Sequence, residues 1–119
     1  MSIHQPSGTH LLADMSGIDA GLLVDCTGIE QLLRGAAAAA GAQVLHSHFH
    51  SFGSGLGVTG VVLLAESHIS IHTWPENGFA AADIFMCGDA QPHLALEVIE
   101  EALQPECSEV RSVDREPPH

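Results

Sequence analysis

The chain has 119 residues, of which 45% are hydrophobic and 15% are charged, and it carries a formal net charge of -12. This length predicts one domain with a single small core, and the composition is typical of a globular chain. Because an acidic surface repels polyanions, neither nucleic acid nor an anionic membrane is expected as a partner. The three basic residues are all arginines, and without lysine the chain cannot hold pyridoxal phosphate, which is bound as a lysine Schiff base.

The cysteines indicate the redox state of the compartment in which the protein is found. Cys26, Cys87 and Cys107 are odd in number and lack paired spacing, which argues against a disulfide framework and for a reducing compartment. The first residues show no basic region followed by an apolar run, and no apolar run is long enough to cross a bilayer. We therefore expect a cytoplasmic protein.

The first half of the chain predicts a strand, a helix and a second strand. Residues 10–14 form a short strand pattern, and a glycine-containing connection follows. Thr27 and Glu30 have the spacing of a capping box, and the apolar residues after them recur at three- and four-residue intervals. A helix is therefore expected to begin near Thr27 and to end at Gly41, which suits a left-handed C-cap. Residues 43–52 predict the next strand.

The second half predicts several strands in close succession and one more helix. Residues 58–65 are a continuous apolar run, which indicates a strand that is central or covered on both faces. An Asn-Gly pair marks a turn at residues 74–78. Asp89 is expected to cap a helix over residues 92–103. Further strands are expected over residues 67–73, 79–87 and 109–113.

The order of these elements defines a fold class. The pattern is β-α-β-β-β-β-α-β, with short links between the middle strands, and short links favour antiparallel neighbours. We expect an α+β fold, a two-layer sandwich in which a mostly antiparallel sheet is covered by two helices on one face.

The stretch over residues 63–76 combines an apolar strand pattern with groups that can do chemistry. Within it, Ile69 and Ile71 alternate with polar residues, so the isoleucines are expected to face a core. The opposite face then presents imidazole and hydroxyl groups, on His68, Ser70 and His72. A strand of this kind can rest on a core and line a site at once.

A second row of histidines raises the question of a metal. His46, His48 and His50 recur with period two and share one face of their expected strand. Neighbouring positions on one face lie about 7 Å apart, which is too far for all three to reach one tetrahedral ion. No metal site is expected. The glycine-rich segment 53–57 lacks the lysine of a phosphate loop and indicates a flexible loop.

The central signature resembles a known family. The chain is similar to the short bacterial and archaeal S-adenosylmethionine decarboxylase proenzymes over roughly residues 8–113. The matching segments are Glu66-Ser67-His68-Ile69-Ser70-Ile71-His72-Thr73-Trp74-Pro75-Glu76, Phe79-Ala80-Ala81, Asp83-Ile84-Phe85-Met86-Cys87-Gly88, Thr9-His10-Leu11-Leu12-Ala13-Asp14 and Phe49-His50-Ser51-Phe52.

The resemblance implies a proenzyme that cleaves its own backbone and thereby forms a covalent carbonyl cofactor. Ser67 would attack the carbonyl of Glu66, and elimination and hydrolysis would then leave a pyruvoyl group in place of Ser67. The single domain would be divided into residues 1–66 and 67–119. By its place in the motif, His72 is implied as the base for this processing, and the hydroxyl of Thr59 is implied to help it.

The resemblance also implies how the substrate is handled. The pyruvoyl carbonyl, the only cofactor implied, would take the substrate amine as a Schiff base, and Cys87 would return a proton after carbon dioxide leaves. Phe52 and Glu76 match positions that hold the nucleoside, the ring by stacking and the carboxylate near the ribose. His68 and Trp74 fall among the substrate-binding positions. A homodimer with its sites at or near the interface is also implied, and the sheet edges of so small a domain favour one.

The sequence departs from the family near the expected substrate pocket, and alternatives stay open. Thr59 replaces the usual serine, and the loop at residues 53–57 is longer by one residue. The leading hypothesis is decarboxylation of S-adenosylmethionine, which supplies the aminopropyl donor for spermidine synthesis. The second is a pyruvoyl-dependent decarboxylase of arginine or ornithine, and the third is a non-catalytic binding module that keeps the fold.

Overall fold

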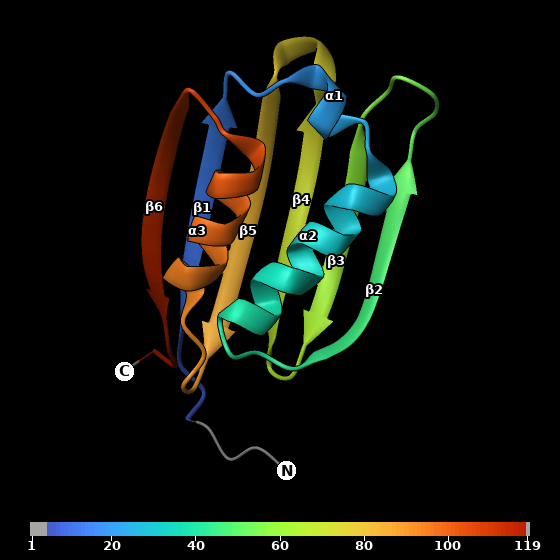
Figure 1. Ribbon diagram of the computed structural model, residues 1–119. Coiled ribbons are helices and arrows are strands. Elements are labelled where there is room, and N and C mark those ends of the chain that lie inside the picture. The colour runs from blue at the N-terminus through green and yellow to red at the C-terminus, as the bar shows by residue number, and fades with distance from the viewer. Residues whose placement is uncertain (1–4, 119) are drawn as a thin grey trace.

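The computed structural model describes residues 5–118 and shows a single antiparallel sheet with helices on one of its faces (Figure 1). The elements in chain order are β1 (Gly8–Ser16), α1 (Ala20–Leu23), α2 (Cys26–Ala39), β2 (Val44–Ser51), β3 (Val58–Leu64), β4 (Ser67–Trp74), the 3₁₀ turn η1 (Pro75–Asn77), β5 (Phe79–Cys87), α3 (Pro92–Leu103) and β6 (Cys107–Arg115). No helix among these residues is both long and apolar enough to cross a membrane.

The sheet has six strands in the order β2-β3-β4-β5-β1-β6, and every neighbouring pair is antiparallel. The three middle links are hairpins, but β1 lies between β5 and β6, far from its neighbours in sequence. Helices α2 and α3 cover one face of the sheet (Figure 1). The expected α+β sandwich with two covering helices is confirmed.

The core lies between this face and the helices, and strand alternation decides what enters it. Ile69 and Ile71 of β4 are completely buried there, as the alternation predicted, and Leu11 of β1 and Ile84 of β5 lie beside them. The helices contribute small and aliphatic side chains, since the stripe of alanines in α2 lets this helix approach the sheet closely. The core side chains of α2 are Ile29, Leu33, Ala36 and Ala37.

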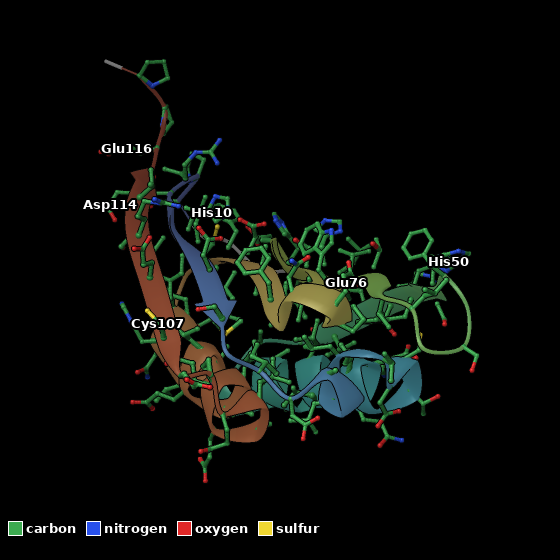
Figure 2. All side chains as sticks on the ribbon, turned by 90° about the horizontal axis from the view of Figure 1, so that it is seen from above. His10, His50, Glu76, Cys107, Asp114 and Glu116 are labelled. Carbon is green, nitrogen blue, oxygen red and sulfur yellow. The ribbon has the colours of Figure 1, made fainter. Side chains whose placement is uncertain are left out.

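The opposite side of the sheet, called the open face here, carries no helix. Figure 2 shows the labelled His10, His50 and Glu76 on the side away from the helices. The strand registers place these residues on the open face: His10, Leu12, Asp14, His46, His48, His50, Thr59, Val61, Leu63, His68, Ser70, His72, Phe79, Ala81, Asp83 and Phe85. The apolar strand over residues 58–65 lies inside the sheet, between β2 and β4, as one of the two alternatives expected. It is covered by helices on one face only, and Leu63 is 46% exposed.

The helix starts differ from the sequence predictions. Helix α2 is capped by Asp25, whose carboxylate accepts a 3.0 Å hydrogen bond from the backbone N–H of Gly28. The expected capping box is wrong, because the helix begins earlier and Glu30 instead accepts a 2.6 Å hydrogen bond from Ser47 on β2. Gly41 does follow the helix with a left-handed φ of 83°, as predicted.

Helix α3 spans the expected residues, but Asp89 does not cap it. The N-cap is Gln91, which makes no side-chain capping bond, and Pro92 occupies the first turn. Proline lacks a backbone N–H and therefore leaves one fewer donor to satisfy at this end. The one-turn helix α1 was not predicted, because four residues carry no periodic signal. Strands β1 and β6 also extend beyond their expected ends.

Candidate active site

The predicted cleavage bond lies in the tight turn between β3 and β4. Leu64 and Ser67 form the last cross-strand pair, so Ala65 and Glu66 alone make the turn. Glu66 has a φ of 61°, in the left-handed region that a residue with a side chain adopts at a cost of order 1–3 kcal/mol. The bond between Glu66 and Ser67 thus lies in an exposed turn, directly after a residue with a strained backbone.

Ser67 lies beside the end of β5. Its Oγ accepts a 3.2 Å hydrogen bond from the backbone N–H of Cys87. Cys87 lines two cavities, of about 540 and 290 Å³, at this strand end. Burial, and then the negative charge of Glu66, raise the pKa of the Cys87 thiol. The thiol is therefore protonated at neutral pH and can give up a proton.

Three rings cluster on the open face next to Ser67. The ring centroids of His68 and Phe85 are 5.9 Å apart, and those of His10 lie 6.2 Å from His68 and 6.1 Å from Phe85. Burial, followed by the neighbouring His10, lowers the pKa of His68, while Asp83 partly offsets this. His68 is consequently uncharged at neutral pH.

A second set of expected site residues gathers at the other end of β4. Thr59 Oγ1 lies 3.0 Å from Nδ1 of His72, across the β3–β4 pair. A cavity of about 360 Å³ opens beside this pair. It is lined by Phe52, Leu56, Gly57, Thr59, His72, Thr73, Trp74 and Glu76, five of which the sequence had singled out.

Aromatic side chains give this cavity its walls. Phe52 is 58% exposed, and its ring meets that of His50 edge-on at 4.8 Å. Trp74 lies against Phe79 at 5.4 Å and against His72 at 6.2 Å. An exposed phenyl ring beside a carboxylate, that of Glu76, is an arrangement that can hold a flat base and a sugar.

The structure thus divides the expected site residues into two groups. The cleavage-end group is Glu66, Ser67, His68 and Cys87, and the loop-end group is Phe52, Thr59, His72, Trp74 and Glu76. Figure 1 shows the β3–β4 turn and the β2–β3 loop at opposite ends of the sheet. His72 follows Ser67 by five residues in one strand, which is about 16 Å at the usual rise. Within one chain, His72 does not reach Ser67.

The remaining histidines of interest lie along the edge strand β2. His46, His48 and His50 share the open face, as the period of two predicted, and all three are exposed. In residues 5–118 no group of three or more histidine, cysteine, aspartate or glutamate side chains is arranged to hold a metal ion.

Sequence reasoning did not single out two polar residues near Ser67. His10 on β1 and Asp83 on β5 approach each other, with 3.3 Å between His10 Nε2 and Asp83 Oδ1. Both alternate with buried residues, Leu11 and Ile84, in strands that otherwise read as core. A polar residue at an outward position of such a strand is the signal that could have found them.

Comparison with known proteins identifies relatives of this chain. The family described as S-adenosylmethionine decarboxylase matches residues 9–116. Proteins called S-adenosylmethionine decarboxylase proenzyme from Methanococcus maripaludis and Aquifex aeolicus are 45% and 46% identical to this chain. The two matches cover 91% and 82% of this chain, and 88% and 73% of the respective relatives.

A solved structure extends the similarity to the fold. The crystal structure of the adenosylmethionine decarboxylase from Aquifex aeolicus superposes with a TM-score of 0.86 at 38% sequence identity. The superposition covers 97% of this chain and 95% of that one, so the two chains share one fold. With a family match over nearly the whole chain and relatives of this similarity, the chain belongs to the S-adenosylmethionine decarboxylase family.

Proposed function

We propose that this chain is a self-processing, pyruvoyl-dependent decarboxylase of S-adenosylmethionine. The observation that carries the proposal is the position of Ser67, which follows a strained turn residue and lies against the end of β5 that bears Cys87. Relatives that are named as proenzymes share this chain's length and fold. The decarboxylated product would supply aminopropyl groups for spermidine synthesis.

Self-processing begins within the cleavage-end group, which holds the nucleophile and the bond that it attacks. Ser67 Oγ attacks the carbonyl carbon of Glu66, so the peptide bond is exchanged for an ester. Loss of the Ser67 α-proton then eliminates the Glu66 carboxylate, which separates residues 1–66 from 67–119 and leaves dehydroalanine at position 67. Its imine tautomer takes up water and releases ammonia, which leaves the pyruvoyl group. Glu66, with its left-handed backbone, lies in the turn outside the strand pairing, so the scissile bond is not part of the hydrogen-bonded ladder.

The base in this step is His72 of a second copy of the chain, assisted by Thr59 of that copy. When the Thr59 oxygen accepts a hydrogen bond from Nδ1–H of His72, the other ring nitrogen, Nε2, is left as a proton acceptor. A histidine in this tautomer can remove a proton near neutral pH.

The residues around Ser67 suit a pyruvoyl group. Such a group supplies a carbonyl that acts as an electron sink for the electrons released with carbon dioxide. Cys87, whose pKa is raised by burial and by Glu66, holds a proton at Sγ beside this position. Its thiol can protonate the substrate carbon once carbon dioxide has left. The neighbouring cavities give room for a small molecule.

A homodimer joins the two groups of site residues. Two copies that pack their open faces together about a twofold axis, with strands running in opposite directions, place the cleavage-end group of one protomer over the loop-end group of its partner. The exposed Leu63 and the half-buried Val61 and Leu12 give this face an apolar component to bury. The dimer would contain two equivalent sites.

The loop-end group supports a nucleoside substrate. Phe52 offers an exposed ring on which adenine can stack, and Glu76 offers a carboxylate to the ribose hydroxyls. His68 and Trp74 complete the walls of the shared site. Arginine and ornithine need no such ring, and the names of the relatives do not favour them.

The three cysteines are free, which fits the reducing cytoplasm.

One experiment tests the function directly. The purified protein is examined by intact-mass measurement and then assayed for carbon dioxide release from S-adenosylmethionine, arginine and ornithine in parallel. Two fragments divided after Glu66, and release from S-adenosylmethionine alone, are expected. A chain that stays whole, or turnover of arginine or ornithine alone, contradicts the proposal.

A further inference from the structure

Thr73 of β4 is a polar residue in an apolar setting. Among the residues that the structure describes, it is the only polar one that is buried, with 6% of its surface exposed. By strand alternation its side chain lies on the helix-covered face, with those of Ile69 and Ile71. It belongs to neither group of site residues, although it lies between His72 and Trp74 and lines the same cavity. A buried hydroxyl is costly unless it is hydrogen bonded, so its partners indicate its role.

The hydroxyl of Thr73 joins three segments at the loop end of the sheet. It accepts a 2.9 Å hydrogen bond from the backbone N–H of Val58, the first residue of β3. It donates a 2.8 Å hydrogen bond to the backbone carbonyl of Leu23, the last residue of α1. Figure 1 shows α1 and the β2–β3 loop at this same end of the sheet. Because the backbone pairing of β3 with β4 ends at Thr59 and His72, the hydroxyl takes the place of the next ladder acceptor.

The same contact continues into the loop that carries Phe52. Gly57 precedes Val58, and a Cβ on Gly57 would collide with the backbone carbonyl oxygen of Thr73, so this close approach requires glycine. The carbonyl of Gly57 in turn accepts a 3.0 Å hydrogen bond from the backbone N–H of Phe52. Thr73 therefore holds the end of the loop, and the end of the loop holds the backbone of Phe52.

Phe52 depends on this support because its ring has little packing of its own. The residue is 58% exposed, and the ring meets His50 edge-on at 4.8 Å. Residues 53–56 are all exposed and include two glycines, so they supply no buried anchor for the loop. A ring outside the core is oriented mainly by its own backbone, which here is fixed at Gly57.

We propose that Thr73 is a positioning residue, which anchors the loop so that the Phe52 ring is set to stack on the adenine of the substrate. This inference rests on the proposed function, in which Phe52 binds that base. Both hydrogen bonds of the hydroxyl go to backbone groups, so it acts on the substrate only through the loop. Its loss should weaken nucleoside binding and leave the chemistry unchanged, because Thr59 and His72 stay paired through the backbone.

Two substitutions of Thr73 test this role. Thr73→Val keeps the branched shape but loses both hydrogen bonds, whereas Thr73→Ser keeps the hydroxyl. In Thr73→Val the KM for S-adenosylmethionine should rise about threefold, less than for loss of the whole ring, with kcat and the two cleavage fragments unchanged. The dissociation constant of 5′-methylthioadenosine, measured by calorimetry, should rise by a similar factor and reports binding apart from turnover. Thr73→Ser should behave as wild type.

A double-mutant cycle separates positioning of Phe52 from a general loss of stability. In the Phe52→Ala background there is no ring to position, so Thr73→Val should raise neither constant further. The matched control is Ile99→Val, which trims a fully buried side chain of α3, lowers stability, and should leave both constants at wild-type values. If Thr73→Val does not fold, Gly57→Ala replaces it, because the added Cβ displaces the loop from Thr73, with the same results expected.

Several results would overturn the proposal. They are wild-type constants in Thr73→Val, a full further rise when Thr73→Val is added to Phe52→Ala, and a Thr73→Ser variant as impaired as Thr73→Val. Wild-type fragment masses, wild-type carbon dioxide release and the KM of Phe52→Ala report separately on the proposed function. Turnover of S-adenosylmethionine, with a raised KM in Phe52→Ala but not in Thr73→Val, contradicts this inference alone. A wild-type protein that neither cleaves nor turns over S-adenosylmethionine contradicts both.

Discussion

Thr59 and His72 face each other across β3 and β4, with 3.0 Å between the hydroxyl oxygen and Nδ1, at the end of the sheet remote from Ser67. The contact fixes the orientation of an imidazole that has no function toward its own chain's cleavage bond. In the proposed dimer, this imidazole acts as the base for the Ser67 of the partner protomer.

Replacement of Thr59 by valine should slow self-cleavage. Valine keeps the branched shape of threonine in the strand but cannot hydrogen bond to His72, so the imidazole loses its preferred tautomer. A loss of general-base assistance corresponds to a factor of about 10²–10⁴ at most. Thr59→Ser keeps the hydroxyl and should cleave normally, followed by intact mass over time. Equal rates for the two variants would remove Thr59 from the processing step.

Two inactive variants should restore cleavage when they are produced together. Ser67→Ala has no nucleophile and His72→Ala has no base, so each alone should remain one chain. In mixed dimers, roughly half of the total if the variants assemble at random, the His72→Ala chain meets the partner's intact His72. Mass measurement should then show fragments from the His72→Ala chain alone.

The absence of any fragments in this mixture, with mixed dimers verified by two different tags, would contradict a site shared between protomers. A simple mixture of the two purified homodimers is the control, because exchange of subunits must precede cleavage there.

Cys87→Ala should separate processing from decarboxylation. The thiol is proposed to act only after the carbonyl has formed, so the variant should still yield two fragments. Carbon dioxide release should fall about 10²–10⁴-fold, the range for loss of a general acid. Cys107→Ala, an exposed cysteine on β6, is the matched control and should behave as wild type. Full turnover by Cys87→Ala would exclude the proton-donor role.

The raised pKa of Cys87 predicts a pH effect. A thiol donates only while protonated, so activity should fall as pH rises through this pKa, above the ordinary range of cysteine. Glu66→Gln removes a negative charge that disfavours the thiolate, so it should move the pKa of Cys87 to lower values. The alkylation rate against pH, in protein whose other two cysteines are serine, measures the shift. An unchanged titration would show that the Glu66 charge does not reach the thiol.

Phe52→Ala should weaken nucleoside binding while cleavage at Ser67 continues. Stacking of a base on an aromatic ring is worth about 1–3 kcal/mol, so the KM for S-adenosylmethionine should rise at least several-fold. Leu45→Ala truncates another exposed apolar side chain, on the strand β2 that ends just before Phe52, outside the cavity, and should leave KM unchanged. If both variants have the same KM as wild type, Phe52 does not stack on the substrate.

The sheet could be predicted from sequence because its alternation is strong. Ile69 and Ile71 enter the core as their spacing indicated, and β5 spans the expected residues. Helix starts were less predictable, since Asp25 and Thr27 are both good caps and packing against β2 decided between them. The capping-box spacing favoured Thr27, which does not cap the helix, over Asp25, which does.

The spatial division of the site could not be predicted from sequence. The signature places Ser67 and His72 five residues apart, which suggests proximity until the residues are seen to lie in one extended strand. Extended backbone converts short sequence separation into a long distance, while the distant Cys87 is brought to Ser67 by strand pairing. His10 and Asp83 also meet only because β1 inserts beside β5.

The strand order has a consequence for the life of the protein after cleavage. The segment before Ser67 supplies β1, β2 and β3, and the segment after Glu66 supplies β4, β5 and β6. Because β1 lies between β5 and β6, the two pieces interlock and cannot part without the sheet coming apart along three seams. The uncut chain folds in a first-order reaction, whereas the cut pieces can reassemble only by encounter, at a rate that depends on their concentration. Processing would therefore leave a fold that formed while the chain was continuous and that the two separate pieces regain less readily after unfolding.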